Sequence, residues 1–127
     1  MKLSISAARQ LMLAAQGLLR RPDHAARKAD VLAAIQRMGA LQLDTISVIA
    51  RSHELALWSR LGIYDPRWLY ELLAEGALFE YWSHAACFLP REDFGLYRRL
   101  MTDGPERRRA WMAEHAELVE RVLARVR

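Results

Sequence analysis

The stretch LQLDTI, residues 41–46, interrupts a chain whose other patterns are mostly helical. Apolar and polar side chains alternate along it, which is typical of a short strand. A helical pattern over 26–38 precedes it, and two more helices are predicted over 52–61 and 66–75. This stretch therefore places one strand between a single helix and a pair of helices.

Two further strands are predicted over 77–82 and 85–89, because aromatic and small apolar residues fill both segments. Only Ser83 and His84 separate them, so we expect an antiparallel hairpin with a very short connection. From residue 30 to residue 89 the order is helix, strand, helix, helix, strand, strand, which is the order of a winged-helix domain.

More helices are predicted on both sides of this domain. One spans 6–19 with Ser4 or Ser6 as its N-cap, one runs from Pro90 to about Met101, and a long one follows through Trp111 to the end of the chain. The predicted fold class is therefore mainly α with a small β-sheet, a winged helix-turn-helix with extra N- and C-terminal helices.

Length and composition limit the possible classes of protein. A chain of 127 residues with 53% apolar and 27% charged residues fits one globular domain and excludes disorder and collagen-like repeats. No stretch of 18 apolar residues and no secretory signal occurs, so we expect a cytoplasmic protein. The last ten residues, LVERVLARVR, stop inside an amphipathic pattern, which predicts that residues 1–127 are a single N-terminal winged-helix module of a longer protein.

The charge is unevenly distributed along the chain. Residues 1–40 carry +5, residues 41–97 carry −4 and residues 98–127 carry +3, and seventeen of the nineteen basic residues are Arg. Because Arg binds phosphate bidentately, two basic segments could form a nucleic-acid surface, although solvated helix faces explain them as well. In the predicted helix-turn-helix, the second helix spans residues 66–75. It carries Glu71 and Glu75, which argues against a sequence-specific repressor.

Gln42 and Asp44 are the most unusual polar pair. Residues two apart on a strand face the same side, so an amide and a carboxylate could share one small reactive group. The alternatives are a polar outer face of an edge strand, or Asp44 capping a nearby turn.

Several segments in order resemble a known family, the bacterial winged-helix DNA glycosylases that repair interstrand crosslinks (the YcaQ/AlkX and AlkZ group). The segments are AAQGLL at 14–19, LQLDTI at 41–46, IARS at 49–52, WSRLG at 58–62 and EYWSHAACFLP at 80–90. The resemblance implies that Gln42, Leu43 and Asp44 occupy the catalytic Gln-apolar-Asp triplet. It also implies excision of N7-alkylated purines from double-stranded DNA, unhooking of interstrand crosslinks and association with the nucleoid. Members of the family are longer, with further winged-helix and β-barrel domains after the first module, so this module alone is expected to be a poor enzyme or inactive.

The chemistry of the residue types agrees with this implication. Alkylation at N7 makes a purine cationic and a good leaving group, so the enzyme mainly has to stabilise the charge on the sugar and direct a water to C1′. A carboxylate at Asp44 can do both, and Gln42 can hold the water or the sugar. A lyase route requires an amine, but Lys2 and Lys28 are the only lysines and neither is near the triplet, which favours hydrolysis without a cofactor.

Other residues carry weaker predictions. Arg51 and Arg60 are candidate phosphate contacts, or surface partners of Glu54 and Asp65, and His84 either approaches DNA or is buried and hydrogen-bonded. The four histidines lack metal-ligand spacing, so no metal is expected. Cys87 and all four tryptophans (Trp58, Trp68, Trp82 and Trp111) are predicted to lie in the core.

Two alternative functions remain open on the sequence. One is a winged-helix domain that binds DNA or protein without catalysis, and the other is a small transcription regulator.

Overall fold

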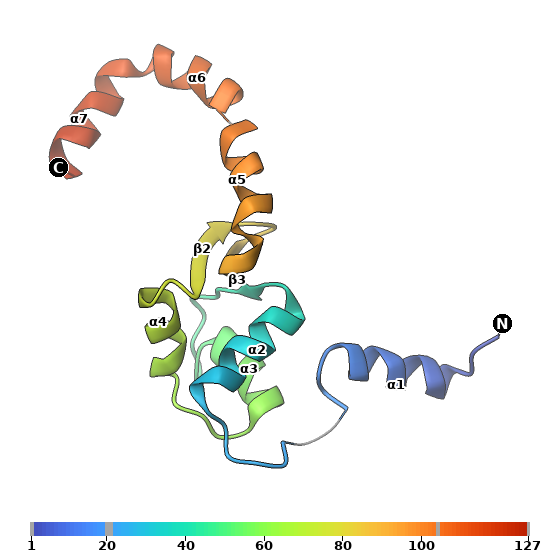
Figure 1. Cartoon of the computed structure of the whole chain (residues 1–127). Coiled ribbons are helices and arrows are strands. Elements are labelled where there is room, and N and C mark those ends of the chain that lie inside the picture. The colour runs from blue at the N-terminus through green and yellow to red at the C-terminus, as the bar shows by residue number, and fades with distance from the viewer. Residues whose placement is uncertain (1, 20–21, 104, 127) are drawn as a thin grey trace. The chain divides into compact units, whose positions relative to one another are not determined.

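The computed structural model describes residues 2–19, 22–103 and 105–126, which form two compact units, Met1–Glu92 and Asp93–Arg127 (Figure 1). The first unit holds residues 41–46 and the segments at 49–52, 58–62 and 80–90.

The predicted order of helix, strand, helix, helix, strand, strand is confirmed in the first unit. It runs α2 (Lys28–Met38), β1 (Leu41–Gln42), α3 (Ser52–Leu61), α4 (Arg67–Ala74), β2 (Leu78–Trp82) and β3 (Ala86–Pro90). The three strands form one antiparallel sheet in the order β1-β3-β2. The predicted class, mainly α with a small β-sheet, is therefore correct.

The core lies between the three helices and one face of the sheet. α2 buries Val31 and Ile35, which lie four residues apart on the same face of that helix. The other members come from every element of the domain: Leu41, Leu57, Leu69, Leu72, Leu78 and Phe88. Full burial of each such side chain contributes about 1.5–3 kcal/mol, so this cluster is the main stabilising feature of the unit.

Cys87 lies in the central strand and is fully buried, as predicted. Burial raises the pKa of its thiol, which keeps it protonated and unreactive.

The predicted strand over 41–46 is wrong beyond Gln42. One more ladder bond follows, from the Leu43 N–H to the Ala86 carbonyl at 2.8 Å, and the chain then turns away. The turn is made by Asp44, whose Oδ1 accepts the Ile46 N–H at 2.8 Å. A side chain that bonds the backbone two residues on closes an Asx-turn, which competes with the strand ladder.

The helix predicted over 6–19 is shorter than expected. α1 (Ile5–Ala15) begins after Ser4, whose Oγ accepts the Ala7 N–H at 3.1 Å, and Gly17 with a φ of 72° follows its end. No described residue of α1 is buried. Two arginines bond its last turn: Arg37 donates to the Ala14 carbonyl at 2.6 Å and Arg60 to the Gln16 carbonyl at 2.9 Å.

The prediction that all four tryptophans are core residues is wrong for three of them. Trp58, Trp82 and Trp111 are 57%, 69% and 51% exposed, and only Trp68 packs against the core cluster. In α3 the core position is taken by Leu57, which turns the adjacent Trp58 outward.

The second unit is helical. A single turn (Arg91–Asp93) spans the boundary between the units, and α5 (Phe94–Asp103), α6 (Pro105–Glu114) and α7 (Ala116–Val126) follow. The single long final helix predicted here is therefore two helices, divided at His115, whose ring stacks on Trp111 at 4.4 Å. Among the described residues, no helix is both long and apolar enough to cross a membrane.

Candidate active site

Gln42 is the last residue of β1 and its side chain is exposed. In the sheet it pairs with Cys87 of β3, which pairs in turn with Tyr81 of β2. The amide is held by a residue 42 positions away, since His84 Nε2 lies 3.2 Å from Gln42 Oε1. Because a carbonyl oxygen can only accept, His84 is the donor, and this contact does not use the NH2 group of Gln42.

His84 lies in the hairpin connection between β2 and β3. The alternative that it is a buried, hydrogen-bonded histidine is right about the hydrogen bond and wrong about the burial, because its side chain is exposed. The hairpin therefore brings an imidazole to the predicted catalytic amide.

Asp44 is half-buried and both of its carboxylate oxygens accept a hydrogen bond. Oδ1 accepts the Ile46 N–H at 2.8 Å, and Oδ2 accepts the Ser52 Oγ–H at 3.3 Å. Each oxygen has a second lone pair, so the carboxylate can still bind a water or a sugar. Asp44 does cap a turn, as the alternative interpretation of the sequence had it, and it does so with one lone pair of one oxygen.

The N-terminus of α3 supports Asp44 from a second direction. Ser52 is the first residue of the helix, and the next residue, His53, is only 2% exposed. His53 Nδ1 accepts the Asp44 N–H at 3.5 Å, and its ring meets Phe88 edge-on at 6.3 Å. The positive end of the helix dipole also favours a carboxylate at this position.

The proton on His53 can be assigned from these contacts. Because Nδ1 accepts, the neutral ring carries its proton on Nε2, which has no hydrogen-bond partner in the part of the chain that the structure describes. Burial lowers the pKa of His53, so the ring is neutral at physiological pH.

Neither Ser52 nor His53 was a candidate on the sequence. They lie eight and nine residues after Asp44, a spacing with no meaning for a strand, and only the turn at Asp44 brings them together.

Arg51 and Arg60 have different environments. Arg51 is the exposed N-cap residue of α3, and Glu54 bonds its backbone N–H at 3.4 Å. Arg60 is half-buried, donating to the carbonyls of Gln16 at 2.9 Å and Ala56 at 2.7 Å. Arg60 therefore has structural contacts within the protein, while Arg51 is exposed.

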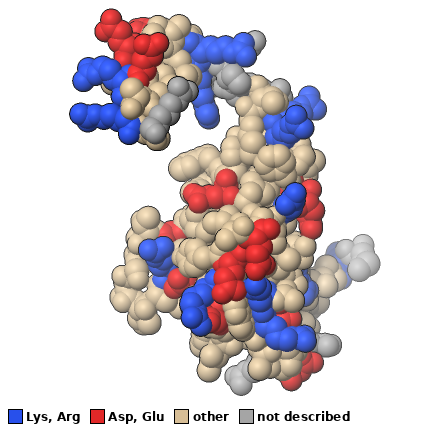
Figure 2. Space-filling view, turned by 60° about the vertical axis from the view of Figure 1, so that its left-hand side comes forward, with Lys and Arg blue, Asp and Glu red and all other residues tan. Residues whose placement is uncertain are grey.

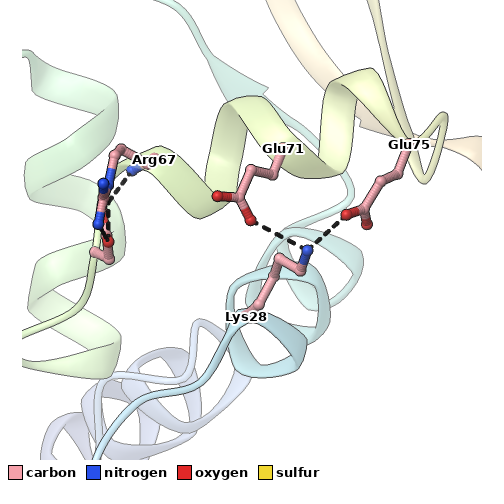
Figure 3. A network of polar contacts seen from close by, with 5 residues as sticks. Lys28, Arg67, Glu71 and Glu75 are labelled. Carbon is pink, nitrogen blue, oxygen red and sulfur yellow. Dashed lines mark hydrogen bonds and ion pairs between the residues drawn. The ribbon is translucent and has the colours of Figure 1, made fainter.

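Lys28 is held by two carboxylates, one from α4 and one from the residue that caps its C-terminus (Figure 3). Its Nζ lies 3.1 Å from Glu71 and 2.6 Å from Glu75, and these hydrogen bonds raise the pKa of Lys28. The ammonium is therefore charged and not nucleophilic. Nearby, Arg67 binds Asp65 at 2.6 Å, so Asp65 is not the partner of Arg60.

The charges of the first unit nearly balance, with eleven Lys and Arg against nine Asp and Glu. On the face drawn in Figure 2, acidic and basic side chains lie next to one another instead of forming one continuous basic area. Within the described ranges, no group of three His, Cys, Asp or Glu is placed to hold a metal ion.

Comparisons with known proteins identify the family of the chain. No solved structure matches the chain. A family model described as "DNA glycosylase AlkZ-like" matches residues 35–127, a range that includes Gln42, Asp44, Ser52, His53 and the hairpin with His84. Because this match covers well over half of the sequence, the chain belongs to the AlkZ-like family of DNA glycosylases, enzymes whose substrate is DNA.

Proposed function

We propose that this protein is a monofunctional DNA glycosylase that hydrolyses the N-glycosidic bond of N7-alkylated purines and unhooks interstrand crosslinks, with Asp44 and Gln42 as its catalytic residues. The observation that carries the proposal is the placement of Asp44. Its carboxylate is fixed by Ile46 and Ser52 at the N-terminus of α3, yet it remains partly accessible.

Asp44 serves the reaction in two ways. As the cationic base departs, positive charge develops on the sugar, and a fixed carboxylate stabilises that charge without having to reorganise. The same group accepts a proton from the water that attacks C1′. The bond from C1′ to the purine nitrogen breaks, its electron pair neutralises the base, and the water oxygen forms the new bond to C1′.

Gln42 orients the reacting groups. The contact with His84 Nε2 engages the carbonyl oxygen of the Gln42 amide. The NH2 group is then available to donate to the water or to a sugar oxygen, and the bond to His84 limits its rotation.

The hydrolytic route is supported by the state of Lys28. A Schiff base requires a neutral amine, whereas Lys28 is bound to Glu71 and Glu75 and its pKa is raised. We therefore expect excision without cleavage of the DNA backbone.

The test is excision of N7-methylguanine from duplex DNA by this chain in excess over substrate, with the Asp44→Asn variant beside it. Asn keeps the shape and an acceptor for the Ile46 N–H but removes the charge. We expect a rate about 10²–10⁴-fold lower, the usual effect of removing a positioned acid–base group. Asp23→Asn, at an exposed carboxylate bound to His24, is the matched control and should excise normally.

Two results would contradict the proposal. Excision at the wild-type rate by Asp44→Asn would remove Asp44 from the mechanism, and a covalent adduct trapped by borohydride would exclude the hydrolytic route. Binding of the lesion duplex without any excision by the wild-type chain would instead favour a non-catalytic DNA-binding module.

A further inference from the structure

The loop that follows Asp44 exposes aliphatic side chains. Val48 is 91% exposed and Ile49 is 93% exposed, and Ile46 just before them is 68% exposed. The Val, Leu and Ile side chains of α2, α4 and the three strands pack on or against the core, whereas these three adjoin a polar site. Clustered exposed apolar groups next to a candidate site indicate a surface that is covered when a partner binds.

This loop has a defined shape. Ser47 and Arg51 form an isolated antiparallel bridge, which closes residues 47–51 into a tip with Val48 and Ile49 at its turn. We refer to residues 47–51 as the aliphatic tip.

The aliphatic tip is fastened to the candidate catalytic carboxylate at both ends. Ile46, directly before it, donates its N–H to Asp44 Oδ1 at 2.8 Å. Ser52, directly after it, donates its hydroxyl to Asp44 Oδ2 at 3.3 Å. A displacement of the tip is therefore transmitted to Asp44, and the tip lies within the same local structure as the site.

The charge at the base of the tip indicates the chemistry of the partner. Arg51 is exposed and ends the tip, so a cation borders the two aliphatic side chains. An aliphatic wedge with an arginine beside it is the combination with which proteins unstack a base step while binding the adjacent phosphate.

We propose that Val48 and Ile49 form a wedge that inserts between base pairs next to the damaged nucleotide, with Arg51 on the neighbouring phosphate. This inference rests on the proposed function and adds to it the means by which Asp44 reaches C1′. Local unstacking bends the duplex and opens the sugar of the lesion to the protein. Because Asp44 fastens both ends of the tip, insertion of the wedge sets the position of the carboxylate at the same time.

The experiment uses a duplex that carries 2-aminopurine beside N7-methylguanine, since 2-aminopurine fluoresces more strongly when it is unstacked. The test variant is Val48→Ser/Ile49→Ser. The matched control is Ile63→Ser, because Ile63 is 90% exposed and lies in the connection between α3 and α4. All three sites are at the surface, so the core cluster is intact in both variants.

We expect the wild-type chain and Ile63→Ser to raise the fluorescence at saturation in low salt, and the tip variant to bind without doing so. The preference for damaged over undamaged duplex should also fall about tenfold in the tip variant, equivalent to about 1.4 kcal/mol. Fluorescence and preference equal to those of the wild type in the tip variant would overturn the wedge and leave the proposed function standing.

Two further outcomes decide against the wedge in different ways. If the wild-type chain does not bind damaged duplex even at low salt, both the wedge and the proposed function of this chain fail. If sedimentation shows a dimer that the tip substitutions abolish, the tip is covered by a second copy of the chain and not by DNA.

Discussion

At the scale of single residues, His53 is the most informative side chain outside the predicted pair. It is buried, it leaves one ring nitrogen without a hydrogen bond among the described residues, and it accepts the Asp44 N–H. An unsatisfied buried polar atom costs about 1–3 kcal/mol, so a histidine here is not explained by packing alone. Positioning of the Asp44 backbone explains it.

Replacing His53 by Leu should therefore loosen Asp44 selectively. Leu fills the apolar space beside Phe88 but offers no acceptor to the Asp44 N–H. We expect the Asp44 amide to exchange with solvent about tenfold faster, as measured by NMR hydrogen exchange, while amides of α4 keep their protection. Equal exchange at Asp44 in both proteins would show that the 3.5 Å contact does not hold the loop.

His53 also predicts how stability depends on pH. Its pKa in the folded protein is lowered from 6.5 by burial, so the unfolded chain takes up a proton at a higher pH than the folded chain does. The free energy of unfolding is therefore constant with respect to this group well above pH 6.5 and falls as the pH decreases below it, by at most about 1.4 kcal/mol per pH unit.

The measurement is chemical unfolding from pH 8 to pH 5 for the wild type and His53→Leu. His24, whose pKa is raised by hydrogen bonds to Asp23 and Asp30, acts with the opposite sign and is present in both proteins. The wild type should lose more stability than the variant below pH 6.5, and parallel curves would contradict the assignment.

At the scale of elements, the sequence predicts correctly those helices and strands whose ends are determined by neighbouring residues. The helices at 52–61 and 66–75 and the hairpin at 77–89 agree with α3, α4, β2 and β3 within about two residues. Their boundaries depend on neighbouring turn and capping residues, which a sequence displays directly.

The strand predicted over 41–46 is too long, because its end depends on contacts with residues that are not its neighbours in sequence. Its alternation is real, but Asp44 bonds Ser52, eight residues away, and lies against His53, so the chain turns before the pattern ends. The polar pair of Gln42 and Asp44 stands out in the sequence. Their partners His84, Ser52 and His53 depend on contacts that only the tertiary fold creates.

Two glycines, one at the end of a helix and one within a helix, give a matched pair of substitutions. Gly39 ends α2 with a φ of 77°, and a Cβ there would meet no atom within 4 Å, so only the backbone conformation opposes a side chain. Gly39→Ala should lower the free energy of unfolding by about 1–2 kcal/mol.

Gly95 lies within α5, is likewise free of close neighbours, and has no left-handed conformation. Gly95→Ala should raise helix stability by about 0.5–1 kcal/mol. Thermal unfolding followed by circular dichroism checks both, and opposite shifts are expected. A loss at both positions would mean that factors other than backbone conformation dominate.

At the scale of the whole molecule, the basic and acidic segments of the sequence do not become separate basic and acidic surfaces. Glu71 and Glu75 bind Lys28 of α2, and each unit carries a net charge of only +2. Binding of DNA by this chain should therefore depend on a few arginines and respond strongly to salt.

Arg51 is the arginine at which this is best tested. If it contacts one phosphate, Arg51→Ala should reduce the slope of log K against log salt by about 1. Arg67→Ala is the control, because Arg67 is equally a surface arginine but its guanidinium is bound to Asp65. Duplex titrations at several salt concentrations give both slopes, and an unchanged slope for Arg51→Ala would exclude a phosphate contact at this residue.

The brevity of β1 has a consequence for the behaviour of the protein in solution. β1 is an edge strand of the sheet and consists of only Leu41 and Gln42 before the chain turns at Asp44. Unpaired edges recruit strands of other molecules and begin aggregation, and very short edge strands are one of the ways in which proteins prevent this. The turn at Asp44 thus also shortens the ladder on which a foreign strand could assemble beside Gln42.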